Sequence, residues 1–254
     1  MTIVLVHGNP ETAAIWEPLR GELGRLGHDG TEIVALSPPG FGAPVPEGFD
    51  ATSDAYLEWL IGELEPLGGT IDLIGHDWGG GHVSRVALAR PDLIRSWTID
   101  IAGCFAPDYV WHDNAQTWQR PGDGEALVGL MLSLSIDDRS AVYESLGMTA
   151  DVARRCAEAF SVETGQCILA LYRSAVQPKM AHLGVALESA ERRASLVIIA
   201  TEDHYTGGPE RAADTARRFG SQIATLDGLG HWWMLQDPAR GASAIAQFLD
   251  TLDR

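Results

Sequence analysis

One aspartate lies where a nucleophile would be expected. The apolar run at 70–74 leads into the segment 75–80 (GHDWGG) and then into a stretch with helical spacing. Small residues two positions before and two positions after Asp77 allow a sharp turn between strand and helix, so that its side chain projects from the strand end. A helix N-terminus also favours an ionised carboxylate. The competing interpretation is that Asp77 only caps the helix, which Asp does well.

A histidine and two acids follow later apolar runs. His231 comes after the run at 222–226, and Glu202 and Asp203 come after the run at 195–200. In a parallel sheet these groups would lie at the same edge as the nucleophile. A histidine that is oriented by a carboxylate can act as a general base. Weaker candidates for the acid, near the end of another predicted strand, are Asp100 and Asp108.

A nucleophilic aspartate implies a two-step reaction. A carboxylate is already anionic and can attack an sp3 carbon that carries a leaving group, which gives an alkyl ester on Asp77. Water activated by His231 would then attack the carbonyl carbon of that ester, and nearby donors would stabilise the tetrahedral species. Ordinary esterase or lipase chemistry is therefore not expected.

These groups need a sheet whose strands end together. Short runs rich in Val, Ile and Leu occur at 2–6, 31–36, 70–74, 95–101, 195–200 and 222–226. Stretches with helical spacing lie between most of them, at 15–26, 55–67, 80–89, 210–219 and 239–252. This alternation predicts an α/β fold with right-handed crossovers and a mostly parallel sheet that is covered on both faces.

One long stretch departs from the alternation. The segment from about 104 to 194 is too long for an ordinary connection, and it carries amphipathic patterns of its own. We therefore predict a helical cap at 104–194, inserted between two strands of a core domain formed by 1–103 and 195–254. A length of 254 residues with 45% apolar content suits one domain with such an insertion.

Composition narrows the range of partners. A net charge of −17, from 18 Lys and Arg against 35 Asp and Glu, would repel nucleic acids and anionic membranes, so neither is an expected partner. The sequence shows neither a signal peptide nor an apolar stretch long enough for a membrane span, which predicts a soluble cytoplasmic protein. Cys104, Cys156 and Cys167 lack metal-binding spacing and are expected as free thiols. No metal or cofactor is expected.

Three motifs resemble those of the α/β-hydrolase fold superfamily, in its Asp-nucleophile branch of epoxide hydrolases and haloalkane dehalogenases. They read HGNP at 7–10, GHDWGG at 75–80 and GHWWMLQDP at 230–238, and the resemblance covers nearly the whole chain. It implies the chain order nucleophile, acid, base, with Asp203 as the acid because that pattern places the acid at the fourth residue of its loop. It also implies an oxyanion hole formed by the backbone N–H groups of Asn9 and Trp78. Most relatives begin with a two-stranded hairpin that is not seen here, which implies a sheet of about six strands.

The two branches differ in how they stabilise the leaving group. Haloalkane dehalogenases typically hold the halide between an Asn and a Trp, which Asn9 and Trp78 match. The cap instead resembles epoxide hydrolases at 118–125 (WQRPGDGE) and 169–173 (LALYR). Within the second motif, Tyr172 matches one of the two tyrosines that protonate the epoxide oxygen.

The position of the second tyrosine reads Asn114, so that role would fall to Tyr109 from a shifted loop. Fluoroacetate dehalogenases bind a substrate carboxylate with arginines after the nucleophile, and here Trp78, Gly81 and His82 stand there instead. We therefore expect an epoxide hydrolase-like enzyme for a small apolar molecule. A haloalkane dehalogenase is the alternative, and a hydrolase-fold binding or signalling protein with little turnover is an alternative of another class.

Several aromatic residues either line an apolar pocket under the cap or pack the cap against the core. They are Tyr109, Trp111, Trp118, Trp232 and Trp233. The histidines of the first two motifs, His7 and His76, are interpreted as structural hydrogen-bonding residues.

Overall fold

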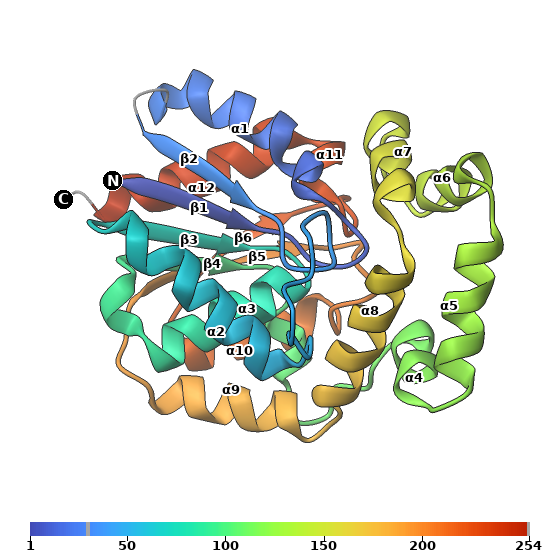
Figure 1. Ribbon diagram of the computed structural model, residues 1–254. Helices are drawn as coiled ribbons and strands as arrows, with labels where there is room; N and C mark the ends of the chain where they lie inside the picture. The colour runs from blue at the N-terminus through green and yellow to red at the C-terminus, as the bar shows by residue number, and fades with distance from the viewer. Residues whose placement is uncertain (29–30, 253–254) are drawn as a thin grey trace.

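The computed structural model describes residues 1–28 and 31–252 and contains a six-stranded sheet in the order β2-β1-β3-β4-β5-β6 (Figure 1). The strands are β1 (Thr2–Val6), β2 (Glu32–Leu36), β3 (Ile71–Gly75), β4 (Ser96–Ile99), β5 (Ala194–Ala200) and β6 (Gln222–Leu226). All five neighbouring pairs are parallel, so the predicted six-stranded, mostly parallel sheet is confirmed. The strand order reverses direction between β1 and β3, which is where ligands bind in open parallel sheets.

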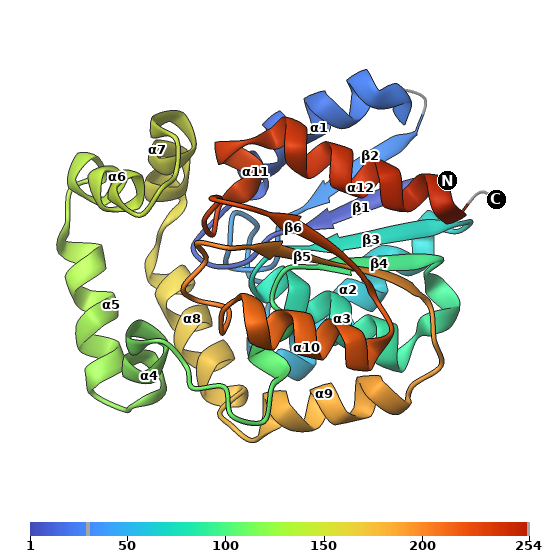
Figure 2. The same cartoon turned by 180° about the vertical axis from the view of Figure 1, so that it is seen from behind.

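Helices cover both faces of the sheet and extend beyond its carboxyl edge (Figures 1 and 2). They are α1 (Glu17–Leu23), α2 (Ser53–Leu64), α3 (Trp78–Ala89), α4 (Asp113–Gln119), α5 (Asp123–Ser133), α6 (Ile136–Ser145), α7 (Ala150–Ala159), α8 (Val162–Ser174), α9 (Lys179–Ser189), α10 (Pro209–Phe219), α11 (Trp233–Gln236) and α12 (Pro238–Leu252). One face carries α1, α11 and α12, and the other carries α2, α3 and α10.

The two covered faces explain the uninterrupted apolar runs of the strands. Every residue of β1 is buried, and its side chains alternate between the two hydrophobic clusters of the core. Ile3 and Leu5 belong to the cluster under α1 and α12, whereas Val4 and Val6 belong to the cluster under α2 and α3. A strand that is buried on both sides has no polar face, so its sequence does not alternate.

One predicted strand is shorter than expected. The run predicted at 95–101 places Trp97, Ile99 and Ile101 at alternate positions, but β4 ends at Ile99. The next residue, Asp100, is 5% exposed and accepts hydrogen bonds from groups at the carboxyl edge of the sheet. Asp100 therefore bonds groups at the sheet edge instead of extending β4.

Six helices lie between β4 and β5, where the cap is predicted. Helices α4 to α8 form an arch beyond the carboxyl edge of the sheet, as both views show (Figures 1 and 2). In contrast, α9 packs against α3 and α10 on the core. The arch is therefore made by α4 to α8, and the domain boundaries at 104 and 194 stay a prediction.

A buried arginine holds the arch together. The Arg139 guanidinium donates to the carbonyl groups of Met131 and Ala157 at 3.0 and 2.7 Å, and to those of Leu134 and Phe160 at 3.2 Å each. These carbonyl groups lie at the carboxyl ends of α5 and α7, where helices leave acceptors unpaired.

In the described part of the chain, no helix is both long and apolar enough to cross a membrane.

Candidate active site

Asp77 occupies a strained turn between β3 and α3. Its backbone angles are φ 49° and ψ −127°, which side-chain-bearing residues rarely adopt. The turn brings α3 so close to β1 that a Cβ atom on Gly79 would lie 2.0 Å from the carbonyl oxygen of Val6. Its carboxylate accepts the N–H of Trp78 at 2.7 Å. Asp77 therefore caps the helix and also lines a cavity, so the capping interpretation is confirmed and a nucleophilic role stays a prediction.

The loop after β1 lies directly against this aspartate. A Cβ atom on Gly8 would lie 2.6 Å from the Cβ atom of Asp77, so only glycine permits this approach. The neighbouring Asn9 is 6% exposed, and neither polar atom of its side chain has a hydrogen-bond partner among the described residues. His7 is structural, as interpreted from the sequence, because its ring bonds to the Gly8 carbonyl group at 2.9 Å and to the Ser37 hydroxyl at 3.0 Å.

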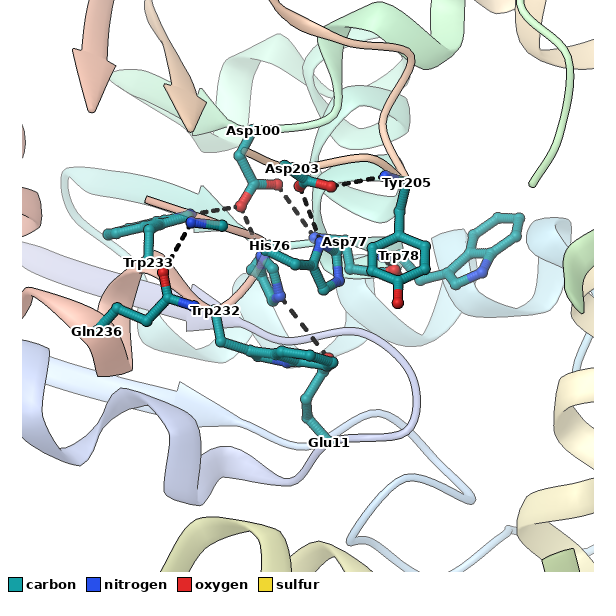
Figure 3. Close-up of polar contacts among 12 residues, drawn as sticks. Glu11, His76, Asp77, Trp78, Asp100, Asp203, Tyr205, Trp232, Trp233 and Gln236 are labelled. Atoms are coloured by element: carbon teal, nitrogen blue, oxygen red, sulfur yellow. Dashed lines mark hydrogen bonds and ion pairs between the residues drawn. The ribbon is translucent and has the colours of Figure 1, made fainter. Parts of the chain in front are cut away.

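His231 and Asp203 form the pair that a general base requires. A hydrogen bond of 2.9 Å joins Nδ1 of His231 to Oδ2 of Asp203, and the other carboxylate oxygen accepts the N–H of Tyr205 at 2.8 Å (Figure 3). Burial raises the pKa of Asp203, but His231 and the Tyr205 N–H outweigh it and lower that pKa below its usual value. Burial would lower the pKa of His231, but Asp203 and Asp77 together raise it above its usual value. His231 lines the same cavity as Asp77.

A second buried network, which the sequence did not reveal, lies behind these residues (Figure 3). Nδ1 of His76 is 2.5 Å from Oδ2 of Asp100, and Nε2 is 3.7 Å from Oε1 of Glu11. Asp100 also accepts the N–H of Asp77 at 3.1 Å and the indole N–H of Trp233 at 2.8 Å. The network therefore supports the turn that carries Asp77. Trp233, considered as a pocket residue, is instead part of this support.

Glu11 connects the network to the loop after β1 and to the last motif. Its carboxylate accepts the N–H of Gly8 and the indole N–H of Trp232, each at 2.9 Å. A single acid in a loop is ordinarily exposed, so nothing in the local pattern marked Glu11 as buried. One sequence feature could have indicated its burial. Glu11 directly follows the first of three motifs that are expected to meet at the same edge of the sheet.

The charged groups of this network change one another's pKa values. Burial would lower the pKa of His76, but Asp100 and Glu11 raise it well above its usual value. Burial would raise the pKa of Glu11, but His76 lowers it to about 2. The pKa of Asp77 is raised to about 7, first by burial and then by Glu11, against the opposing effects of His231 and His76. A protonated His76 therefore lies between Glu11 and Asp100, close to a carboxyl group of Asp77 whose pKa is about 7.

Three of these residues could also offer ligands to a metal ion. One ligand atom each from Glu11, His76 and His231 lies within 4.8 Å of the other two. Both rings bond a second carboxylate through Nδ1, as metal-binding histidines do. Because Glu11 and Asp100 favour the protonated form of His76, an ion would have to displace that proton first.

Asp77 lines a cavity of about 130 Å³ beneath the arch. Its polar lining includes Asn9, Asp77, Asn114, Tyr172 and His231. Most of the remaining surface is apolar and comes from the arch, with Leu127, Val128, Met131, Val142, Leu146 and Phe160. A small, mainly apolar molecule suits this enclosure.

The predicted pocket residues divide into two groups. Trp118, Tyr172 and Trp232 line the cavity, whereas Trp111 lines a neighbouring one of about 30 Å³ that also reaches Asp77. Tyr109 is a correction, because it lines neither of these two cavities in the described structure. Its hydroxyl donates to the Tyr205 carbonyl group at 2.8 Å, so it is not placed to protonate a substrate.

Two cavity residues escaped the sequence interpretation. His112 caps α4 by accepting the N–H of Ala115 at 3.3 Å, and its ring also lines the cavity. Tyr143 lies on the inner side of α6, and its hydroxyl has no hydrogen-bond partner among the described residues. Neither belongs to a motif, and the position of each depends on how the arch folds back over the sheet.

Arg173 brings the two cap motifs together beside Tyr172. Its guanidinium forms two hydrogen bonds of 2.8 Å with Glu125 and donates to the Trp118 carbonyl group at 3.1 Å. A bidentate arginine–carboxylate pair fixes orientation as well as distance. This pair joins α8 to α5 and holds the helix turn that carries Tyr172.

Comparison with known proteins identifies relatives of the chain. The family model described as "Alpha/beta hydrolase family" matches residues 3–244. An epoxide hydrolase of Caballeronia sordidicola is 28% identical over 102 residues, which are 37% of this chain and 29% of that protein. An (E)-2-((N-methylformamido)methylene)succinate hydrolase of Acinetobacter baylyi is 28% identical over 98 residues, which are 38% of this chain and 36% of that protein. The matched region thus spans about a third of each curated relative.

Solved structures show the same fold at low sequence identity. The haloalkane dehalogenase DbeA from Bradyrhizobium elkani has a TM-score of 0.75 and 17% identity, with 99% of this chain and 90% of that chain covered. A thermophilic esterase from Thermogutta terrifontis has a TM-score of 0.72 and 21% identity, with 100% and 91% covered. The chemistry of these neighbours differs, so they bear on the fold alone.

Proposed function

The chain belongs to the α/β hydrolase family, and we propose that it is a hydrolase that opens small, mainly apolar epoxides through a covalent ester on Asp77. The observation that supports this most is the placement of Tyr172. Its side chain comes from the arch and lines the same cavity as Asp77 and His231. A nucleophile, a base and a proton donor around one enclosed space are what hydrolytic epoxide opening requires.

In the first step, a carboxylate oxygen of Asp77 attacks one epoxide carbon and the bond from that carbon to the epoxide oxygen breaks. The oxygen takes the proton of the Tyr172 hydroxyl, which leaves a phenolate and an alkyl ester. The pKa of Asp77 near 7 means that the attacking carboxylate is available from neutral pH upward. Burial and the adjacent Asp77 raise the pKa of Tyr172 well above its usual value, so its hydroxyl is protonated before the reaction.

In the second step, His231 takes a proton from water, and the resulting hydroxide attacks the carbonyl carbon of the ester. The N–H of Trp78, which already donates to the Asp77 carboxylate at 2.7 Å, is placed to stabilise the tetrahedral species. Collapse releases the diol oxygen as an alkoxide. The protons then held by the Asp77 carboxyl group and by His231 restore the diol hydroxyl and Tyr172.

Haloalkane dehalogenation is the second candidate, because Asn9 and Trp78 match the pair that holds a leaving halide. A halide leaves without a proton, so that reaction would not need Tyr172. The third possibility, a binding or signalling protein with little turnover, would keep the cavity but not the chemistry.

A substrate panel separates the three. Wild-type protein and Asp77→Ala would be incubated with aliphatic and aromatic epoxides and with bromoalkanes, and diol and bromide would be measured. Diol formation that is lost in Asp77→Ala supports the proposal. Bromide release with no diol would replace it by the second candidate, and inertness toward both panels in folded protein would favour the third.

A further inference from the structure

The side chains of Asn9 and Trp78 each carry an N–H donor and line the cavities beside Tyr172. Asn9 is buried, and its amide has no hydrogen-bond partner among the described residues. Trp78 is 6% exposed, and its ring meets that of Tyr172 edge to face at a centroid distance of 5.0 Å. Asn9 and Tyr172 line the larger cavity together with Asp77, and Trp78 and Tyr172 line the smaller one. The amide, the indole and the phenol therefore meet beside the nucleophile.

The side chains of Asn9 and Trp78 also influence the pKa of Tyr172. Burial is the main reason that the pKa of Tyr172 is raised, and the negative charge of Asp77 adds to it. The side chains of Trp78 and Asn9 act in the opposite sense and lower that pKa. An N–H group lowers the pKa of a phenol when it can donate to the phenolate oxygen, because the charged form gains more from the donor.

We propose that Asn9 and Trp78 form a binding site for the phenolate oxygen of Tyr172, rather than for a departing halide. When the epoxide oxygen takes the proton of Tyr172, negative charge appears on the phenol oxygen, close to the carboxylate that has just reacted. The amide N–H of Asn9 and the indole N–H of Trp78 stabilise that charge. One supported tyrosine then does the work for which two are expected, which accounts for Asn114 at the second position and for the occupied hydroxyl of Tyr109.

This inference rests on the proposed function for the reaction it serves, but its geometric part can be tested without turnover. If the Tyr172 side chain fills the space in front of the two donors, bromide cannot reach them in the wild-type protein. Tyr172→Phe removes the hydroxyl and leaves the donors free, so bromide should bind at least about tenfold more tightly, which corresponds to about 1.4 kcal/mol. The readout is saturable quenching of tryptophan fluorescence, with bromide titrated at constant ionic strength.

Two further variants make the halide test specific. Asn9→Leu combined with Tyr172→Phe should lose the gained bromide binding, because one of the two donors is gone. Tyr205→Phe is the matched control, since Tyr205 lines both cavities but its removal frees neither donor, and it should gain nothing. Equal bromide affinity in wild type and Tyr172→Phe would overturn the inference, because Tyr172 would then not occupy the space in front of the donors. Asn9→Ala replaces Asn9→Leu if the latter does not fold.

A kinetic test asks whether Asn9 acts through Tyr172. The rate of ester formation would be measured under single-turnover conditions with an epoxide, for Asn9→Leu, Tyr172→Phe and the double variant. Each single change should slow ester formation, and the double variant should be no slower than Tyr172→Phe alone. Multiplying losses would mean that Asn9 contacts the substrate directly and would reject its role through Tyr172. If wild-type protein opens no epoxide, the proposed function fails, while the bromide titration still decides whether the hydroxyl fills the site.

Discussion

The backbone N–H of Asp77 donates to Oδ1 of Asp100 at 3.1 Å, so the strained turn of the nucleophile is tied to the end of the neighbouring strand. The same carboxylate holds His76 and Trp233 through its other oxygen. One buried acid therefore restrains the nucleophile and balances a buried positive charge. Asp100 was considered from the sequence as a possible partner of His231, whereas the structure places Asp203 in that position.

Asp100→Ala should lower the free energy of unfolding by more than removal of a surface acid does. Removing one partner of a buried ion pair leaves the other uncompensated, which costs about 3–5 kcal/mol. Chemical denaturation should show a loss of that size, and ester formation should slow because the turn is less restrained. Asp108→Ala is the matched control, since Asp108 is exposed and forms a surface ion pair with Arg211, and it should change stability by about 0.5 kcal/mol or less. Similar losses in both variants would contradict the role given to Asp100.

His231→Gln should trap the covalent intermediate. Formation of the ester uses the carboxylate of Asp77, whereas its hydrolysis needs a base to activate water. Intact-protein mass should therefore increase by one substrate after reaction with an epoxide, and Asp77→Ala should show no adduct. A complementary measurement is a single turnover in heavy-oxygen water, which should label the peptide containing Asp77 and leave the first diol unlabelled. Label in the first diol, with no adduct in His231→Gln, would mean that water attacks the substrate itself.

Tyr172→Phe should discriminate between leaving groups. An epoxide oxygen needs a proton as it leaves, so ester formation from epoxides should slow by about 10²–10⁴-fold. A bromide needs none, so any cleavage of bromoalkanes should change by less than about tenfold. Rates of ester formation on both substrate classes would be compared with those of wild type. Equal losses on both would assign Tyr172 to packing.

Replacing the nucleophile by Asn should stabilise the protein in a pH-dependent way. The pKa of Asp77 rises from 3.8 to about 7 on folding, chiefly through burial, so between those values the folded state binds more protons than the unfolded state. Stability of the wild type is therefore lost as the pH rises from about 4 to about 7. Asp77→Asn lacks this effect, and its melting temperature should exceed that of wild type by several degrees at pH 8. The difference should fade below about pH 4; a constant difference across this range would refute the assigned pKa.

The sheet and the sharp turn at Asp77 could be predicted because their signals are local. The central strand β1 is buried on both faces, so its sequence is mainly apolar, and the spacing of Gly75, Asp77 and Gly79 reflects one tight turn. The buried partners could not be found in this way. Glu11 and Asp100 are acids whose burial depends on contacts from distant segments, and the exclusion of Tyr109 from the cavity depends on how one connection of the arch packs. Contacts between distant segments also decide which residues line the cavity, and those residues would determine the substrate preference.

The position of the arch in the chain also bears on how the protein is made. Ser96 and Ala194 are register partners on β4 and β5, yet they lie roughly a hundred residues apart in the sequence. The N-terminal strands supply the nucleophile and the donors around it, whereas the acid and the base arrive with β5 and β6. During synthesis the first four strands emerge well before β5, so the backbone hydrogen-bonding groups along that edge of β4 have no partner strand at this stage. The proposed catalytic site is complete only when β5 and β6 dock, and we expect chaperone protection of the β4 edge to matter most while the arch is being translated.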